Sequence, residues 1–401
     1  MWKDDFSIDF NIVFNRKNRG YQQVFNSFST VTKIFTTMKD SHSINELKER
    51  MASGKEVFCS GLFLSARWFA LAGAASPGIN LIVLPDRDSA EYCSSDLYSL
   101  IDGDRVFFLP VSGKSVERSN YKSSLGVQRT SAVNSIMNWK PGSPALFIVS
   151  WPEALEEPVP DRSRISGAVL NLRKGEEISR DKIVEVLAAQ NFTKTDFVSA
   201  PGQFAVRGSI IDIFSFSDSH PFRISFFGDE VENINVFDCN TQLSREVRDE
   251  ASIFPDIIAG DNADGGVPVS AILPQDTVVW LDSSDMYRER EFFSGLDPFR
   301  KVFIDTPLSR KDAVPVNFSI APQPVFNKNF DLLSTDIATK MENGYKVLIY
   351  CEKESQSERL RSILSRNGGL FPEFVIGKNL HRGFIDNENK ICRYTDHEIY
   401  D

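Results

Sequence analysis

The sequence predicts an α/β fold in which a parallel-sheet domain is joined to a small inserted α+β domain and a further small α/β domain. Short apolar runs alternate with helix-like segments between residues 56 and 150, as strands and crossover helices do in a parallel sheet. A stretch rich in Pro, Glu and Arg follows at 152–166, and closely spaced strand-like runs come after it. The 401 residues, 41% of them hydrophobic, suffice for two to four domains.

The first predicted domain, residues 51–167, follows an amino-terminal arm at 1–50. Its predicted strands are EVFCSG (56–61), NLIVLP (80–85), RVFFLP (105–110) and ALFIVS (145–150). Its predicted helices are 62–75, 87–101 and 131–139. Apolar runs this continuous are typical of strands that are buried on both faces. Residues 255–320, with TVVWLD (277–282) and KVFIDT (301–306), are predicted to complete the same sheet.

The second predicted domain, residues 168–254, begins with the strand AVLNLRKG (168–175) and a helix over 179–190 for which Ser179 is a suitable N-cap. Two longer apolar runs, each of the kind that pairs as a strand, follow: GQFAVRGSIIDIF (202–214) and HPFRISFFGDEVENINVFD (220–238). Gly228-Asp229 predicts a tight hairpin turn within the second run.

The third predicted domain, residues 321–401, follows a Pro-rich stretch at 309–325 that reads as a linker. It contains the strand KVLIYC (346–351), a helix over 357–368, and short strands around Phe374 and Ile391. The abrupt end at TDHEIYD leads us to expect a fragment of a longer protein.

Composition excludes several functional classes. The net charge is −10, which repels the phosphate backbone and disfavours broad non-specific DNA binding. The five cysteines are scattered without a CxxC pair, and the four histidines have no metal-ligand spacing, so we expect reduced, mostly buried thiols and no metal site. No apolar run approaches the about 18 residues of a membrane span and no signal peptide is evident. We expect a cytoplasmic protein.

Two strand-to-helix turns could hold a nucleotide phosphate, and neither has the required residues. A P-loop needs GxxxxGK[ST], whose first glycine lets the backbone amides wrap the phosphates. Gly113-Lys114-Ser115 has Phe108 in place of that glycine, and the polar residues after it do not predict an amphipathic helix. The turn after Cys59 has Ala66, Arg67 and Trp68 where the glycine, lysine and hydroxyl residue of GK[ST] would stand. The topology therefore resembles a RecA-like, P-loop NTPase domain with a degenerate site, and no catalytic constellation is evident.

The second domain carries a family resemblance. FAVRGSIIDIF, FRISFFGDEVENINVFD and TQLSREV resemble, in order, the segment shared by the excision-repair protein UvrB and the transcription-repair coupling factors. LRKGEEISRDKIVEVLAAQNFTKTDFVSAPGQ and HRGFIDNENKICRYTDHEIYD are similar to the coupling-factor versions of the second and third domains. The resemblance covers about residue 50 to the end.

The coupling factors are favoured over UvrB because UvrB has an intact P-loop and an aromatic hairpin that clamps damaged DNA. Residues 86–150 contain only Tyr92, Tyr98 and Tyr121 as tyrosines and show no such hairpin pattern. The resemblance implies a non-catalytic, monomeric module, similar to UvrB domains 1 and 2, that recruits UvrA and needs no cofactor. It also implies that RNA polymerase and DNA contacts, and the ATP- and Mg²⁺-dependent translocase motor, belong to parts of the family that are absent here.

The resemblance places the UvrA-binding surface on the second domain, at Arg207, Arg223 and Phe227, with Lys194 as a weaker addition. Strand alternation independently puts Arg223, Ser225 and Phe227 on one face and Phe222, Ile224 and Phe226 on the core face. An exposed arginine beside an exposed phenylalanine is typical of an interface hot spot.

If the family resemblance is set aside, the same residues fit an ordinary solvent-exposed surface that binds no partner. Arg223 or Arg207, on neighbouring strands, would then pair with Glu230 or Asp229. On either reading we expect the outward side chains to contribute little to folding. Two other functions stay open. One is an active UvrB-like ATPase that binds damaged DNA, and the other is an interaction scaffold with no role in repair.

Overall fold

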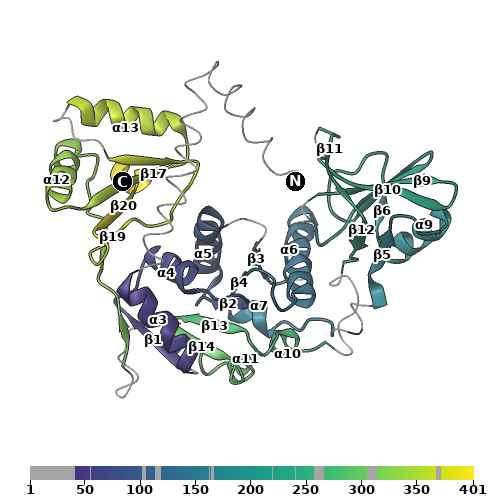
Figure 1. The fold of residues 1–401 in the computed structure, drawn as a ribbon, viewed down its shortest axis with the longest axis horizontal. Coiled ribbons are helices and arrows are strands. Elements are labelled where there is room, and N and C mark those ends of the chain that lie inside the picture. The colour runs from purple at the N-terminus through teal and green to yellow at the C-terminus, as the bar shows by residue number, and fades with distance from the viewer. Residues whose placement is uncertain are drawn as a thin grey trace, which may run out of the picture. The chain divides into compact units, whose positions relative to one another are not determined.

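The computed structural model describes residues 41–54, 56–101, 105–112, 119–161, 163, 167–218, 220–239, 241–256, 266–304, 314–366 and 372–401. These residues divide into two compact units. One consists of the described parts of 1–49, 61–74 and 317–401, and the other of 50–60 and 75–316. The predicted mixed α/β class with a parallel sheet is confirmed (Figure 1).

A seven-stranded sheet, in the order β15-β1-β14-β13-β2-β4-β3, forms the centre of the larger unit. The pairs from β1 to β3 are all parallel. The strand bounds are β1 (Glu56–Ser60), β2 (Ile79–Val83), β3 (Val106–Phe108), β4 (Leu146–Ser150), β13 (Val278–Asp282), β14 (Arg300–Ile304) and β15 (Val316–Asn317). The apolar runs near residues 280 and 302 thus lie between β1 and β2, and β2 and β13 are buried along their whole length, as continuous apolar strands must be.

Helices and short helical turns connect these strands. They are α5 (Arg87–Leu100), α6 (Ser119–Asn138), α7 (Pro152–Glu156), α10 (Val269–Ile272), the 3-10 turn η2 (Ser284–Met286) and α11 (Glu291–Ser294), while α3 (His42–Ser53) spans the boundary of the units. Helix α6 starts twelve residues before its predicted start. Its polar character misled the prediction because the buried face of α6 includes Arg129, which is 1% exposed. The Arg129 guanidinium donates to the carbonyls of Pro110, Ala154 and Glu157.

The second domain consists of a six-stranded sheet in the order β11-β10-β9-β8-β7-β6 and a separate pair, β5 with β12. The strands are β5 (Leu170–Arg173), β6 (Thr193–Lys194), β7 (Gln203–Arg207), β8 (Ile210–Phe214), β9 (Phe222–Phe227), β10 (Glu230–Phe237), β11 (Ser244–Arg248) and β12 (Glu250–Ile253). Helix α9 (Arg180–Ala189) lies beside the sheet (Figure 1), and its Ile183 and Leu187 pack into the same core as Ile211 and Ile224. One face of the sheet is therefore covered by α9 and the β5–β12 pair.

Two local predictions in this domain need correction. Residues 202–214 form two strands, β7 and β8, joined by a turn at Gly208, whose φ is +58°. Ser179 stands at the N-cap of α9 as expected, but its side chain makes no capping hydrogen bond.

The smaller unit contains a five-stranded sheet in the order β16-β19-β20-β17-β18. The strands are β16 (Ile320–Pro322), β17 (Lys346–Cys351), β18 (Glu373–Ile376), β19 (Phe384–Asp386) and β20 (Ile391–Thr395), and the helices are α4 (Ala66–Ala74), α12 (Phe330–Glu342), α13 (Glu354–Arg366) and α14 (Asp396–Tyr400). Helix α12 was not predicted, because only Leu333 and Ile337 of it are buried and the apolar period is weak. The stretch read as a linker contains β15 and β16, and β16 pairs as an edge strand with β19.

All five cysteines are free, and four of them are buried, as predicted. Burial raises the pKa of the Cys59 thiol to about 12. The described residues contain no His, Cys, Asp and Glu group suited to a metal ion. No helix in the described ranges combines the length and apolar character that crossing a membrane requires.

Candidate protein-binding surface

Strand β9 separates a core face from an outer face, as its alternation predicts. Phe222, Ile224 and Phe226 are buried, and they pack in the core under α9. Arg223 lies on the outer face with 20% of its side chain exposed, and Phe227 is 79% exposed. The predicted face assignment is therefore confirmed, and the outer face of the sheet is the candidate surface.

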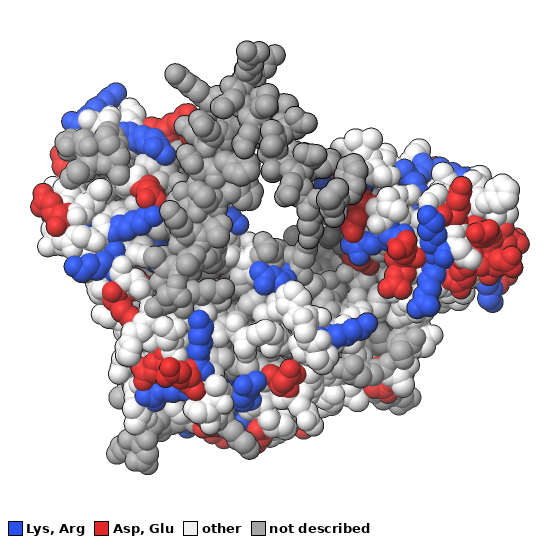
Figure 2. Space-filling view, viewed as in Figure 1, with Lys and Arg blue, Asp and Glu red and all other residues white. Residues whose placement is uncertain are grey.

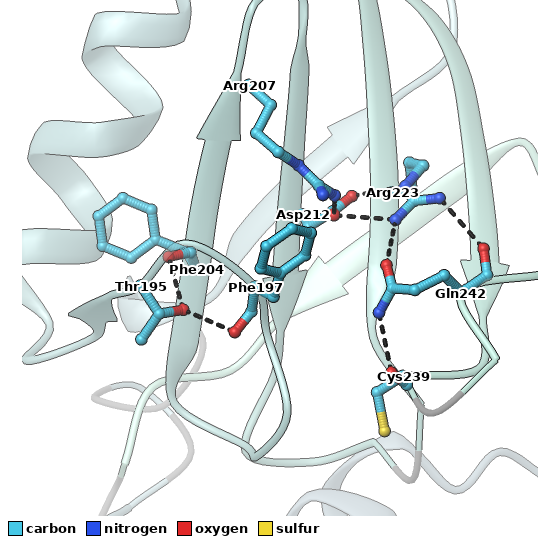
Figure 3. A network of polar contacts seen from close by, with 8 residues as sticks. All are labelled: Thr195, Phe197, Phe204, Arg207, Asp212, Arg223, Cys239 and Gln242. Atoms are coloured by element: carbon cyan, nitrogen blue, oxygen red, sulfur yellow. Dashed lines mark hydrogen bonds and ion pairs between the residues drawn. The ribbon is translucent and has the colours of Figure 1, made fainter.

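The arginines of the outer face converge on a buried aspartate that the sequence analysis missed. Asp212 lies on β8, directly opposite Arg223 in the strand register, and is 1% exposed. Its carboxylate accepts hydrogen bonds from Nε (2.8 Å) and Nη2 (3.0 Å) of Arg223 and from Nη2 of Arg207 (Figure 3). The two arginines are not on neighbouring strands, because β8 lies between β7 and β9. Their shared partner is Asp212, and not Glu230 or Asp229.

Further contacts fix the Arg223 side chain from the other side. Its Nη2 donates to Oε1 of Gln242 at 2.9 Å, and its guanidinium carbon lies 4.1 Å from the centre of the Phe237 ring. Gln242 is itself held by a hydrogen bond from its amide to the carbonyl of Cys239. The hydrogen bonds to Asp212 raise the pKa of Arg223 above its usual value. Arg223 is therefore a charged, positioned side chain whose contacts contribute to folding.

Arg207 reaches further into solvent. Its side chain is 37% exposed, and its guanidinium carbon lies 4.8 Å from the ring centre of Phe197, which is itself 61% exposed (Figure 3). The carbonyl of Phe197 accepts a 3.1 Å hydrogen bond from the Thr195 hydroxyl. This cation–π pair exposes both part of the charged Arg207 side chain and the aromatic side chain of Phe197 to solvent.

Lys194 differs from the other candidate residues. The register sets it opposite Phe204, whose ring packs in the core, and paired residues point to the same side of a sheet. The structure thus brings Arg207, Arg223 and Phe227 to one face and puts the exposed Lys194 on the other. Asp212 could have been found from sequence, since a lone carboxylate inside the apolar run IIDIF needs a cationic partner when buried.

The surface of this domain carries both signs of charge. Figure 2 shows both basic and acidic side chains on its visible face. The described residues on that visible face form no continuous basic stripe of the kind that a nucleic-acid footprint requires.

The turn after β1 has the residues of a packed turn. Leu62 is buried, and Nε of Arg67 donates to the carbonyl of Leu64 at 2.9 Å. Gly61 has a φ of +69°, and a Cβ there would come within 2.3 Å of the carbonyl oxygen of Phe318. The close approach of the Phe318 backbone therefore explains why glycine stands at position 61, and no role in phosphate binding is needed to explain it. The other candidate, Gly113-Lys114-Ser115, lies outside the described residues.

Comparisons with known proteins point to the same domain. Residues 170–257 match the family model of the UvrB interaction domain. A transcription-repair-coupling factor of Bacillus subtilis is 30% identical over 227 residues, which are 55% of this chain and 19% of the relative. A second, from Haemophilus influenzae, is 27% identical over 177 residues, which are 44% of this chain and 15% of the relative.

UvrABC system protein B of Streptococcus suis is 40% identical over 91 residues, or 22% of this chain and 14% of that protein. The chain thus spans less than a fifth of the length of these relatives. The resemblance seen in the sequence is confirmed: residues 170–257 match the UvrB interaction domain, and 55% of the chain aligns with the coupling factor of Bacillus subtilis.

Proposed function

We propose that this chain is a non-catalytic module of a transcription-repair coupling factor that recruits UvrA to sites of stalled transcription. The match to the UvrB interaction domain and the coupling-factor relatives support this role. Coupling to RNA polymerase and ATP-driven movement on DNA would then depend on parts of the protein beyond this sequence.

One observation carries the proposal. Within the matched residues, Arg207 and Arg223 are held on the buried Asp212 on the face of the sheet opposite α9, and the exposed Phe227 follows Arg223 on that face by strand alternation. Positioned arginines beside an exposed aromatic ring are characteristic of interface hot spots, since little side-chain entropy is lost on binding. Arg207 offers its exposed edge to an acidic group of UvrA, and Phe227 needs an apolar pocket.

We further propose that the first domain has a RecA-like arrangement and holds no nucleotide. Leu62 and Arg67 pack where a P-loop would have its phosphate cradle and lysine, which supports this. Isothermal titration should show no saturable binding at micromolar ATP. Binding there would favour a UvrB-like ATPase, although the similarity to the UvrB relative is confined to 91 residues.

The test of UvrA recruitment is an affinity measurement with purified UvrA from the same organism at about 150 mM salt. The intact chain should bind, and Phe227→Ala should weaken binding by about tenfold or more, as loss of a hot-spot aromatic does. Met286→Ala is the matched control, because Met286 is 72% exposed but lies outside the second domain. Absence of binding by the intact chain, or equal binding by Phe227→Ala, would overturn the proposal.

A further inference from the structure

Exposed apolar side chains gather at both edges of the outer face. Of the described residues, four large hydrophobic side chains of the second domain are more than half exposed: Phe197, Phe227, Leu243 and Val247. Phe197 follows β6, at one edge of the sheet, and Val247 lies on β11, the strand at the opposite edge. Neither residue belongs to the Arg207, Arg223 and Phe227 set.

The strand register puts Val247 on the same face as Arg223. Arg223 pairs with Asn235, and Asn235 pairs with Val247. Cross-strand partners in an antiparallel sheet point to the same side. Val247 is 67% exposed, so it adds an apolar contact two strands away from the buried Asp212–Arg223 pair.

Phe197 is joined to the same face through Arg207. Its ring lies under the Arg207 guanidinium, and Arg207 in turn is bound to Asp212. An aromatic ring that orders an exposed arginine reduces the entropy that the arginine would lose on binding. Phe197 remains 61% exposed and can still contact a partner.

The dimensions agree with one docking patch. Strands β7 to β11 span four strand spacings, or about 19 Å at about 4.8 Å each. A protein interface of ordinary size covers about 800 Å² on each partner, which is a disc about 30 Å across. Phe197 and Val247 therefore lie within a single interface that has the Asp212–Arg223 pair near its centre.

We infer that Phe197 and Val247 are two further contact residues for UvrA, one at each edge of the outer face. This inference rests on the proposed UvrA-binding function. It requires a UvrA surface that has an acidic group for Arg207 between two apolar contacts, and not a purely acidic patch.

The experiment measures UvrA affinity for Phe197→Ala and Val247→Asp. Each should bind about tenfold more weakly than the unmodified chain, and Phe197→Tyr, which keeps an aromatic ring, should retain affinity. Val325→Asp is the matched control for Val247→Asp, since Val325 is 71% exposed and lies in the smaller unit.

Circular dichroism of each variant establishes that it is folded. If Phe227→Ala weakens binding while Phe197→Ala and Val247→Asp bind like the unmodified chain, the extended patch is wrong and the proposed function stands. If the unmodified chain does not bind UvrA, the proposed function itself fails. If Val325→Asp weakens binding as much as Val247→Asp, the effect is not specific to the outer face and the inference is overturned.

Discussion

Replacing Arg223 with alanine should destabilise the second domain, contrary to the small effect that its outward position predicts. The change removes two hydrogen bonds to Asp212, of 2.8 and 3.0 Å, and two to Gln242, of 2.9 and 3.3 Å. Asp212 is 1% exposed, so its carboxylate would keep only Arg207 as a charged partner. An orphaned buried charge costs about 3–5 kcal/mol, but here Arg207 remains, and water can reach the site that Arg223 vacates. We therefore expect a loss of about 2 kcal/mol in the free energy of unfolding.

Hydrogen exchange of the full chain measures this locally. Amides of β8 and β9 in Arg223→Ala should exchange about 30-fold faster, which corresponds to about 2 kcal/mol when exchange follows the opening equilibrium. The same substitution in an Asp212→Asn background should cost less, because no carboxylate is then left unpaired. Unchanged exchange in Arg223→Ala, or an equal cost in both backgrounds, would refute the assignment of Asp212 as the anchor.

Three other perturbations test the packing and electrostatics. Phe226→Ala should lower the free energy of unfolding of the second domain by about 3–5 kcal/mol, as a large core truncation does, while Phe227→Ala should change it by no more than about 0.5 kcal/mol. Thermal melting of the two variants side by side is the measurement, and equal melting temperatures would contradict the face assignment. Arg393→Met should stabilise the smaller unit by about 1 kcal/mol, because the buried Arg393 guanidinium has no hydrogen-bond partner among the described residues and contacts the rings of Phe69 and Phe384. Slower hydrogen exchange in β20 would support this, and faster exchange would oppose it. Burial raises the pKa of the Asp218 carboxyl, so the folded state keeps that proton to higher pH, and the free energy of unfolding should fall as pH rises above the unfolded-state pKa. Denaturation at several pH values should show a smaller fall for Asp218→Asn than for the unmodified chain. An identical pH dependence would contradict this.

The face assignment was predictable from sequence, and the partner of the arginines was not. Alternation in FRISFF fixes which side chains face the core, because the strand period is two whatever the neighbours are. The partner of Arg223 depends on which strand lies beside β9, and this was misjudged when residues 202–214 were taken as one strand. Once Gly208 divides that run, β8 lies next to β9 and brings Asp212 opposite Arg223.

Other differences have the same physical origin. The start of α6 was misplaced because local composition does not reveal that three backbone carbonyls bind the Arg129 guanidinium. Phe197 lies on a loop without periodicity, so only its stacking on Arg207 identifies it. Local pattern predicts elements and faces, whereas long-range pairing determines polar partners.

Site-specific photo-crosslinking to UvrA tests the central claim most directly, namely that the outer face of the second domain binds UvrA. A photoreactive phenylalanine analogue in place of Phe227 should crosslink to UvrA. The same analogue in place of Lys182 should not, because Lys182 lies on α9, which covers the opposite face, and its side chain is 64% exposed. A crosslink from position 182 and none from position 227 would contradict the account.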